Sequence, residues 1–313
     1  MGKANIRFLA DKRLYSRTEE CLQFLRKLGP GSDKPSLPIP QRFHVYWYGP
    51  ISAKQTFTIK SFLATQDLKR SELWLWLDNE SGYAGYKKNP QLLPYLPYLH
   101  VRRFDPEAEA RNTPLERRPE LYRNVSLSAR SDFFRFVALY KYGGIYIDMD
   151  IMFLRDMSRL IRNFHSEFCY QWSSQPFANS AVLKLRQHSK NAQKLLTRCI
   201  RVKSCHPRKV LRLDYNIDLD LLVLPCPFFD PLWPHHDRED KYKAAPFQRF
   251  EDFFRKFDKK FQRKPTIHSY RDFFPGAFAY HWHNVWDAHE HKNSYFGFFD
   301  QEFDSILRKK LGI

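Results

Sequence analysis

Hydrophobic and aromatic residues gather into short runs along the chain, and amphipathic stretches separate these runs. The run Phe43–Tyr48 is aromatic and β-branched and ends at Gly49-Pro50, which predicts a strand followed by a turn. Residues 54–68 predict a helix, and two further strands are expected at Leu73–Leu77 and His100–Phe104. Because strands and helices alternate at this spacing, we expect an α/β fold with a Rossmann-like, mainly parallel sheet flanked by helices.

A second helix, turn and strand follow in the middle of the chain. Residues 128–142 place Phe133, Phe136, Val137 and Tyr140 at spacings of three and four, which is typical of an amphipathic helix. Gly143-Gly144 is a natural helix end, and the next strand is expected at Ile145–Ile147. This strand runs directly into the triplet Asp148-Met149-Asp150.

The two ends of the chain read differently from its centre. Residues 1–28 carry a charged helical pattern with Leu14, Cys21, Phe24 and Leu25 on its apolar face, and a Gly/Pro-rich linker follows. We therefore expect a helical N-terminal extension and linker at 1–36 and a main domain at 37–313. Toward the C-terminus, residues 221–224 predict a strand, and the Phe-rich segment 235–264 predicts an amphipathic helix that packs on the core.

Composition and charge narrow the class of protein. The chain has 313 residues, of which 43% are hydrophobic, and this indicates a globular protein with a sizeable core. Its net charge of +18 favours polyanionic partners, among them nucleic acid, an anionic membrane surface and phosphorylated ligands. The five cysteines are odd in number and irregularly spaced, which favours free thiols over a disulfide framework.

The expected cellular compartment depends on whether the sequence contains a signal peptide or a membrane helix. The first residues are too charged for a signal peptide, and no apolar run approaches the roughly 20 residues of a membrane helix. We therefore expect a soluble cytoplasmic protein. A Golgi enzyme that had lost its anchor would look similar.

The candidate chemistry lies in residues 131–150. On a strand, Asp148 and Asp150 point to the same side, and burying two like charges together is costly unless a cation binds them. Mn²⁺ or Mg²⁺ fits this need, because both prefer oxygen ligands and both bridge phosphate groups. On the preceding helix, Asp132 and Arg135 share a face, where the guanidinium suits a phosphate and the carboxylate suits sugar hydroxyls. Two plainer readings exist: the D-x-D triplet as a solvated turn, and Asp132 with Arg135 as a surface ion pair.

The same run resembles the DxD sugar-binding region of glycosyltransferase family 32. That family includes relatives of α-1,4-galactosyltransferases, initiating α-1,6-mannosyltransferases and capsule-synthesis enzymes, and the glucosylating domains of clostridial toxins share its motif. The resemblance rests on eight positions with fixed spacing: Ser131, Asp132, Arg135, Gly143, Gly144, Tyr146, Asp148 and Asp150.

Similarity to this family extends over roughly residues 42–288. The segment 44–50 is similar to the family's first strand, in which Trp47 matches a tryptophan that stacks on the nucleotide base. Asn179 matches a donor-binding asparagine, although Gln187 stands where a family glycine precedes the later histidine. The segment 281–286 resembles a C-terminal His/Trp motif that ligates the metal, and its register leaves His281, which we prefer, and His283 as alternatives.

The resemblance implies a GT-A catalytic domain, a divalent metal and a nucleotide-sugar donor. A UDP-sugar is favoured, with GDP-mannose second, and the hexose is transferred with retention to a glycan, lipid-linked or protein acceptor. In this reading Asp132, Arg135, Asp148 and Asp150 are catalytic, and Trp47, Tyr146 and Asn179 complete the donor site. Asp148, Asp150 and His281 (alternatively His283) hold the metal.

The sequence leaves two alternative functions open. A metal-dependent nucleotide-sugar hydrolase also uses paired aspartates. A basic nucleic-acid-binding protein is supported by the charge alone, so we do not expect nucleic acid as the partner. Peripheral contact with an anionic membrane stays open.

Overall fold

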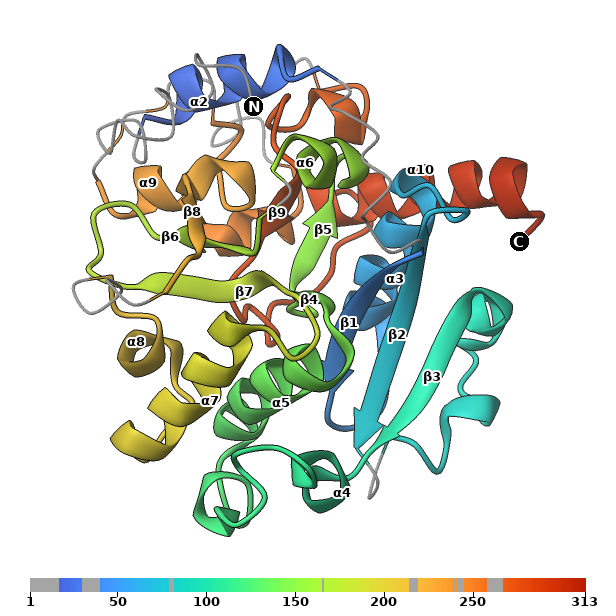
Figure 1. The fold of residues 1–313 in the computed structure, drawn as a ribbon. Coiled ribbons are helices and arrows are strands. Elements are labelled where there is room, and N and C mark those ends of the chain that lie inside the picture. Colours follow the sequence, from blue (N-terminus) through green and yellow to red (C-terminus); the bar gives the residue numbers. More distant parts are fainter. Residues whose placement is uncertain are drawn as a thin grey trace.

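The protein is described by a computed structural model that covers residues 17–29, 40–78, 82–164, 166–213, 219–238, 240, 242, 245–257 and 267–313. Within these residues, helices cover both faces of a seven-stranded sheet with strand order β3-β2-β1-β4-β7-β6-β8, and β5 and β9 form a separate two-stranded ribbon (Figure 1). The expected α/β class is therefore confirmed.

The strands are β1 (Gln41–Trp47), β2 (Ser71–Asp78), β3 (Leu99–Phe104), β4 (Gly144–Ile147), β5 (Ile151–Phe153), β6 (Phe168–Gln171), β7 (Ala178–Leu185), β8 (Leu222–Leu224) and β9 (Ala279–His281). The α-helices are α2 (Thr18–Arg26), α3 (Ala53–Thr65), α4 (Pro106–Ala110), α5 (Leu127–Tyr142), α6 (Ser158–Asn163), α7 (Lys190–Val202), α8 (Pro207–Val210), α9 (Trp233–His236) and α10 (Tyr295–Leu311). Short 3₁₀ turns occur at Tyr86–Lys88, Leu93–Tyr98, Pro119–Leu121, Cys226–Phe228, Phe250–Phe253 and Tyr270–Asp272.

The sheet is mainly parallel, as expected. β1 pairs in parallel with β2 and β4, β2 with β3, and β6 with β8. β7 is antiparallel to both of its neighbours, β4 and β6. The βαβ unit predicted for the first half of the chain is thus present, and a reversed strand separates it from the rest of the sheet.

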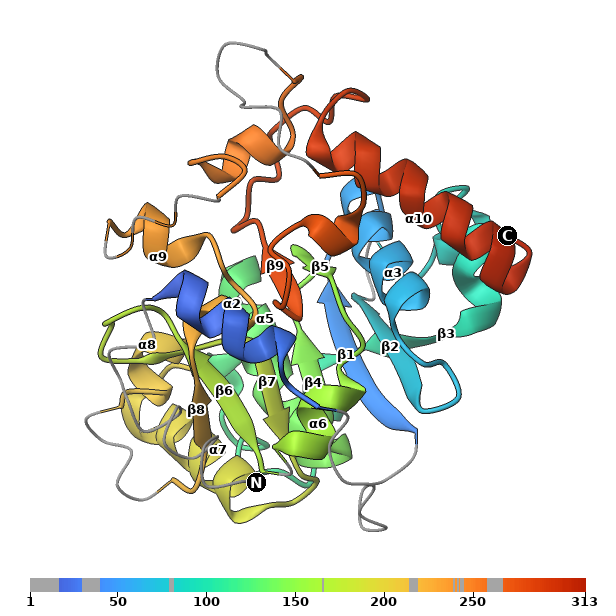
Figure 2. The ribbon, with the colours of Figure 1, turned by 90° about the horizontal axis from the view of Figure 1, so that it is seen from above.

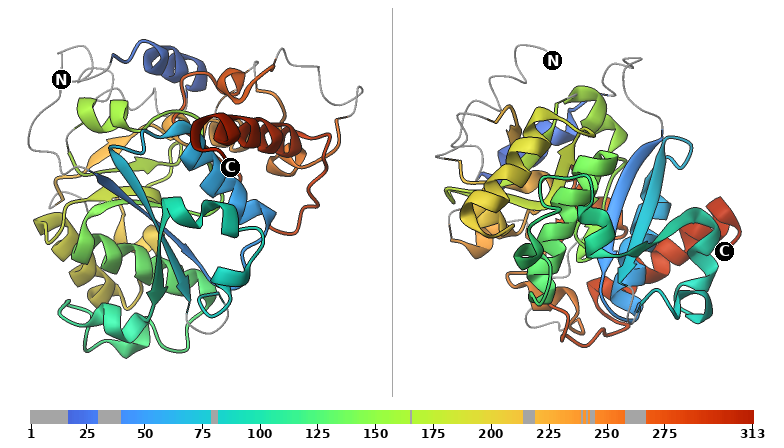
Figure 3. Two further views of the ribbon diagram at one scale, coloured as in Figure 1. Left: turned by 90° about the vertical axis from the view of Figure 1, so that its right-hand side faces the viewer. Right: turned by 60° about the horizontal axis from the view of Figure 1, so that its bottom comes forward.

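Alternating side chains of the central strands build two cores. Phe43 and Val45 of β1 belong to the core that also contains residues of α3 and α10. Tyr46, from the opposite face of β1, belongs to the core beneath α5 and α7. Figures 1 and 2 show α3 beside α10, whereas α5 and α7 lie together on the other face of the sheet, and Figure 3 gives two further views of this layering. The period-two alternation of side chains in a strand explains this division.

The N-terminal helix α2 packs against the main domain through Cys21, Leu22 and Leu25, which are fully buried. Phe24 adds a ring contact to Phe228 at 6.5 Å. Leu14 and most of the proposed linker lie outside the described residues. The division at residue 36 stays a prediction.

The expectation of a helix across 235–264 is wrong for the described part of this segment. There, α9 ends at His236, and a 3₁₀ turn at Phe250–Phe253 is the next helical element. Phe247 and Phe253 are nevertheless buried in the core, as the aromatic spacing indicated. The spacing of three and four reflects side chains packed from an irregular chain rather than one face of a helix. Residues 258–266 lie outside the described residues.

The turn from α5 into β4 requires glycine at two successive positions. Gly143 and Gly144 have φ of +62° and +108°, a region that residues with a Cβ rarely adopt. A Cβ would also lie 2.7 Å from the backbone nitrogen of Gln187 at the first position and 2.4 Å from the carbonyl oxygen of Arg42 at the second. The pair lets the helix end directly against the sheet and start the strand that leads to Asp148.

His44 fixes this turn from the neighbouring strand. Its ring is fully buried, and Trp76 donates to its Nδ1 at 3.1 Å, so Nε2 carries the proton and donates to the carbonyl oxygen of Gly143 at 2.8 Å. Burial, with Arg42 and Arg102 nearby, lowers the pKa of His44 from 6.5 to about 4, although the Gly143 carbonyl raises it. The neutral ring is therefore the form that the fold selects.

Acidification is expected to destabilise the protein through His44. Because the unfolded chain binds this proton near pH 6.5 and the folded chain only near pH 4, the contribution of His44 is complete above pH 6.5. It is lost as the pH falls toward 4, by up to roughly 3 kcal/mol. Denaturant unfolding across this range measures the loss, and His44→Asn should show a shallower pH dependence than the wild type. Parallel curves for the two proteins would rule out this role of His44.

Candidate active site

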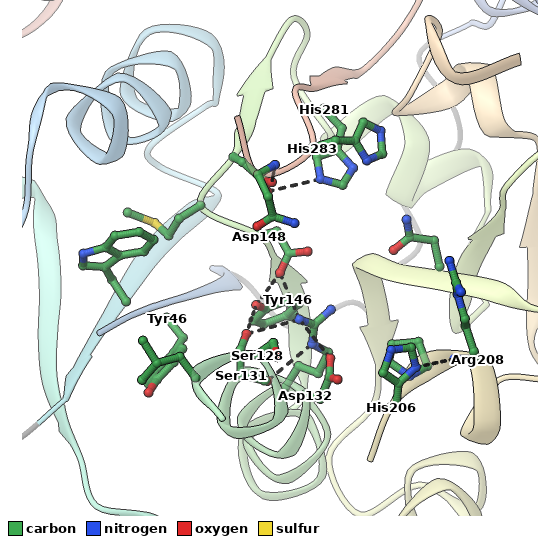
Figure 4. Close-up of a pocket in the computed structure, with 18 of the residues that line it drawn as sticks. Tyr46, Ser128, Ser131, Asp132, Tyr146, Asp148, His206, Arg208, His281 and His283 are labelled. Atoms are coloured by element: carbon green, nitrogen blue, oxygen red, sulfur yellow. Dashed lines mark hydrogen bonds and ion pairs between the residues drawn. The ribbon is translucent and has the colours of Figure 1, made fainter. Parts of the chain in front are cut away.

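A cavity of about 500 Å³ opens where β1 and β4 end. Figure 4 shows α5 and the loops after β4 and β9 directing side chains into this space. Its lining includes all nine residues that the sequence singled out: Trp47, Asp132, Arg135, Tyr146, Asp148, Asp150, Asn179, His281 and His283. The structure therefore brings together residues that are separated by up to 236 positions in the chain (283 − 47).

The Asp148-Met149-Asp150 triplet lies in a turn and not on a strand, which differs from the expectation. β4 ends at Ile147, and β5 begins at Ile151 in the separate ribbon. Met149 is buried in the core on the α3 side of the sheet, and its carbonyl accepts a hydrogen bond from Thr58. With Met149 held on that side, both carboxylates face the cavity, so the turn gives the same outcome as strand alternation.

Arg135 is the centre of a buried polar network on the α5 side of the cavity. Its Nη2 lies 3.3 Å from Asp132 Oδ1 and 3.2 Å from Asp148 Oδ1, and its Nη1 donates to Ser180 at 2.7 Å. Tyr146 donates to the same Asp148 oxygen at 2.6 Å. Asp148 Oδ2 has no hydrogen-bond or ion-pair partner among the described residues, so the second oxygen of this carboxylate is available to a ligand.

Burial dominates the electrostatics of Asp132. The low exposure of this carboxyl raises its pKa to about 6, against the lowering effect of Arg135 and with a further increase from Asp148. By contrast, burial lowers the pKa of Arg135, but four surrounding anionic or phenolic groups raise it by more, so the guanidinium stays charged. The interpretation of Asp132 and Arg135 as a surface ion pair is wrong, because their side chains are only 11% and 8% exposed.

Asp150 forms a second network, on the ribbon side of the cavity. Its Oδ1 lies 3.2 Å from His281 Nε2, and its Oδ2 accepts the backbone N–H of Asn284 at 2.7 Å. Burial alone would raise the pKa of Asp150, but His281 and the Asn284 amide lower it. In return, burial would lower the pKa of His281, and the carboxylates of Asp150 and Asp230 raise it.

The two histidine alternatives occupy different places. His281 Nε2 faces Asp150, whereas His283 Nε2 binds Asp230 Oδ2 at 2.6 Å. Possible metal-ligating atoms of Asp148, Asp150 and His281 lie within 4.8 Å of one another, and His283 instead groups with Asp230 and His281. The first group joins both carboxylates of the triplet and is rich in oxygen ligands, which suits Mn²⁺ or Mg²⁺. The geometry therefore favours His281 over His283 for that metal.

Trp47 lies at the rim of the cavity, tilted against Trp286 with ring centroids 4.7 Å apart. The loop that carries Trp286 is anchored by the buried Lys54 of α3, whose Nζ donates to the carbonyl oxygens of Val285 and Ala288 at 2.8 and 2.6 Å, and to that of Trp286. A strongly bound ammonium group thus holds the aromatic rim in position.

Asn179 stands on β7 at the opposite wall. Its Oδ1 accepts the backbone N–H of Ala181 at 2.7 Å, which orients the amide. Its Nδ2 is buried and has no hydrogen-bond partner within the described part of the chain. Buried donors are nearly always paired, so this N–H is suited to a ligand that enters the cavity.

Sequence reasoning did not assign roles to several residues of the site. Ser131 contacts Arg135 and Tyr146, whereas the sequence identifies it only as part of the motif. Asp230 is fully buried beneath His281 and His283, and Trp172 lines the cavity and donates to Asp230 at 3.0 Å. A lone carboxylate within the aromatic run at 228–233 was the available signal for Asp230. No local signal marks Trp172.

Comparisons with known proteins match one segment of the chain to a protein family. Residues 86–167, which contain α5 and the Asp148–Asp150 turn, match the family described as "Glycosyltransferase sugar-binding region containing DXD motif". A comparison with curated protein sequences finds no significant match.

Several solved structures are similar to this chain. The bifunctional glycosyltransferase WbbM is 11% identical, with 88% of this chain and 53% of WbbM covered and a TM-score of 0.50. An active-site mutant of LgtC is 11% identical over 86% of this chain and 95% of LgtC, with a TM-score of 0.47. Mouse xyloside xylosyltransferase 1 is 14% identical over 78% and 98%, with a TM-score of 0.45.

The likeness to WbbM concerns the fold, and the family match concerns a segment that contributes α5 and the Asp148–Asp150 turn to the cavity. The chain therefore has the GT-A fold seen in WbbM, and its residues 86–167 match the DXD-containing sugar-binding region of glycosyltransferases.

Proposed function

We propose that the protein transfers a hexose from a nucleotide-sugar donor, preferably a UDP-sugar, to a glycan, lipid-linked or protein acceptor with retention of configuration. The observation that carries this proposal is the meeting of Asp148, Asp150 and His281 within 4.8 Å of one another at the cavity. Trp47 and Trp286 form the aromatic rim beside them.

The donor is proposed to lie across the cavity from the aromatic rim to α5. Trp47 stacks on the base, and Asp148, Asp150 and His281 hold a divalent cation at the diphosphate. When bound, such a cation offsets the charge that develops on the leaving group. Arg135 provides a fixed positive charge beside the same oxygens, and it needs no rearrangement because Ser180 and Ser131 already hold its guanidinium.

The sugar is proposed to lie against Asp132, Tyr146 and Asn179. Asp132 accepts hydrogen bonds from hydroxyl groups, and the unpaired Nδ2 of Asn179 donates to a sugar oxygen. The cavity carboxylates of Asp132, Asp148 and Asp150 are each bound to an arginine or histidine. They therefore suit electrostatic stabilisation better than nucleophilic attack, and we assign no covalent nucleophile.

Thermal unfolding with UDP-glucose, UDP-galactose, UDP-N-acetylglucosamine and GDP-mannose, each with and without Mn²⁺, tests the proposal. A ligand that binds only the folded state raises Tm. At a concentration a hundredfold above its Kd, it adds about 2.7 kcal/mol to the free energy of unfolding. We expect a Mn²⁺-dependent rise with one UDP-sugar, and a smaller rise when Trp47 is replaced by alanine. The absence of any Mn²⁺-dependent rise across the panel would contradict the proposed donor and metal.

Product analysis separates transfer from hydrolysis. Transfer gives a glycosylated acceptor and free nucleotide in equal amounts. Release of nucleotide and free sugar in the presence of every acceptor class would favour the nucleotide-sugar hydrolase instead.

A further inference from the structure

A second cavity, of about 420 Å³, lies at the other end of the β5–β9 ribbon. In this ribbon, Ile151 pairs with His281 beside the active site, and Phe153 pairs with Ala279 two residues farther on. Leu154, which directly follows β5, and Ala277, two residues before β9, line the second cavity. The two cavities thus share one short antiparallel ribbon and are separated by its length.

The lining of this cavity is strongly basic. Four arginines contribute to it, namely Arg26, Arg155, Arg159 and Arg271, against the single carboxylate of Asp156. They come from three separate stretches of the chain: α2, the loop after β5 together with the adjacent α6, and the 3₁₀ turn at Tyr270–Asp272. Figures 1 and 2 show α2 and α6 as neighbours on one side of the molecule.

Arg155 is the most informative of the four. Its Nη1 donates to the carbonyl oxygens of Gly276 at 2.6 Å and Leu25 at 3.1 Å, so the guanidinium is held in place. It forms no ion pair with a carboxylate among the described residues. Burial and the neighbouring Arg159 both lower the pKa of Arg155, as expected where a positive charge lacks a compensating anion.

The N-terminal helix completes the cavity. Arg26 of α2 is held by Glu19 at 3.3 Å and by the carbonyl oxygen of Pro275 at 3.4 Å. Gly276 has φ of +114°, and a Cβ there would lie 2.5 Å from the carbonyl oxygen of Leu22, so this glycine permits α2 to pack closely. Arg26 and Arg155 are thus fixed by backbone contacts, while Arg159 and Arg271 are exposed and have no ion-pair partner within the described ranges.

We propose that this cavity binds a phosphate-bearing anion at a site separate from the active site. Guanidinium groups present paired N–H donors that match phosphate oxygens, and an anion would neutralise the partly buried charge of Arg155. The cavity is large enough for a headgroup rather than a single ion. The phosphate belongs either to a free metabolite or to a lipid headgroup. The proposal does not depend on the identity of the donor sugar.

The site is tested by titrating the full chain with inorganic pyrophosphate in the presence of EDTA and measuring the Kd by calorimetry. The test variant is Arg159→Ala/Arg271→Ala, and the matched control is Arg111→Ala/Arg201→Ala, which removes two exposed arginines outside both cavities. Any contribution of the active site is the same in the two variants. Each lost charge-assisted contact weakens binding by about tenfold or more, so we expect at least a tenfold higher Kd for the test variant alone.

A parallel arm measures flotation with phosphatidylcholine vesicles that contain or lack phosphatidylglycerol. Loss of flotation in the test variant but not in the control identifies a lipid headgroup as the source. Loss of pyrophosphate affinity with unchanged flotation identifies a free phosphate compound. Equal behaviour of the two variants in both arms, with Tm values equal to that of the wild type, would overturn the site.

Discussion

Replacing Asp150 with asparagine is expected to lower the rate of sugar transfer by at least about a thousandfold while leaving the fold intact. The carboxylate is 3% exposed and lies between His281 and the amide of Asn284, where the proposed cation binds. Asparagine keeps an oxygen that accepts the Asn284 N–H, but it removes the charge that attracts the cation. Loss of several kcal/mol of transition-state stabilisation corresponds to this fall in rate.

The measurement is turnover of the donor identified by the thermal panel, with and without added Mn²⁺. Asp300→Asn is the matched control, because Asp300 forms a 2.8 Å ion pair with Lys60 away from the cavity. We expect the control to retain the wild-type rate, and the Mn²⁺-dependent rise in Tm to disappear only in Asp150→Asn. An Asp150→Asn enzyme with near-full activity would exclude the proposed metal site.

The parts of the fold that the sequence predicted are those whose side chains alternate or repeat clearly. β1 carries aromatic residues and a valine, β2 alternates Leu and Trp, and α5 places its Phe residues at helical spacing. Their bounds agree with the expectation to within a few residues. These elements are two interior strands of the sheet and a helix that packs on it, where burial on a fixed face constrains residue type strongly.

The strands that sequence reasoning missed lack such a signal. β7 is buried along its whole length, so its sequence, Ala178–Leu185, mixes Asn, Ser and Lys with apolar residues and shows no alternation. β5 and β9 are three residues long each, too short for any period to appear. The ribbon they form is nevertheless what joins Asp150 to His281, so the local sequence could not show how this half of the site is built.

The residues of the site also fall into those that local sequence spacing predicts and those that it does not. Local spacing indicated that Asp132 and Arg135 share a helix face and that Asp148 and Asp150 point together, and the structure shows both. Asp230 and Trp172 contact one another across 58 positions of the chain, and only tertiary packing brings them to the histidines. When the role of a residue depends on such packing, the residues next to it in the sequence show no pattern that predicts the role.

Replacing Arg135 with methionine is expected to destabilise the protein by about 3–5 kcal/mol. The change leaves Asp132 and Asp148 in a largely buried site without their common cation, and removing one member of a buried ion pair has this effect. Denaturant unfolding in the absence of metal measures it. As a matched control, Arg123→Met breaks the ion pair with Glu107, whose partners are 57% and 50% exposed, and should change stability by at most about 1 kcal/mol.

A second substitution distinguishes lost charge compensation from lost packing. If the uncompensated carboxylates cause the instability of Arg135→Met, Asp132→Asn should be less harmful, or even favourable, in that background. The resulting coupling between the two positions should be about 1–3 kcal/mol. Additive effects of the two substitutions would show that Arg135 stabilises the site by packing instead, and its proposed action on the donor phosphates would then need a source other than this charge network.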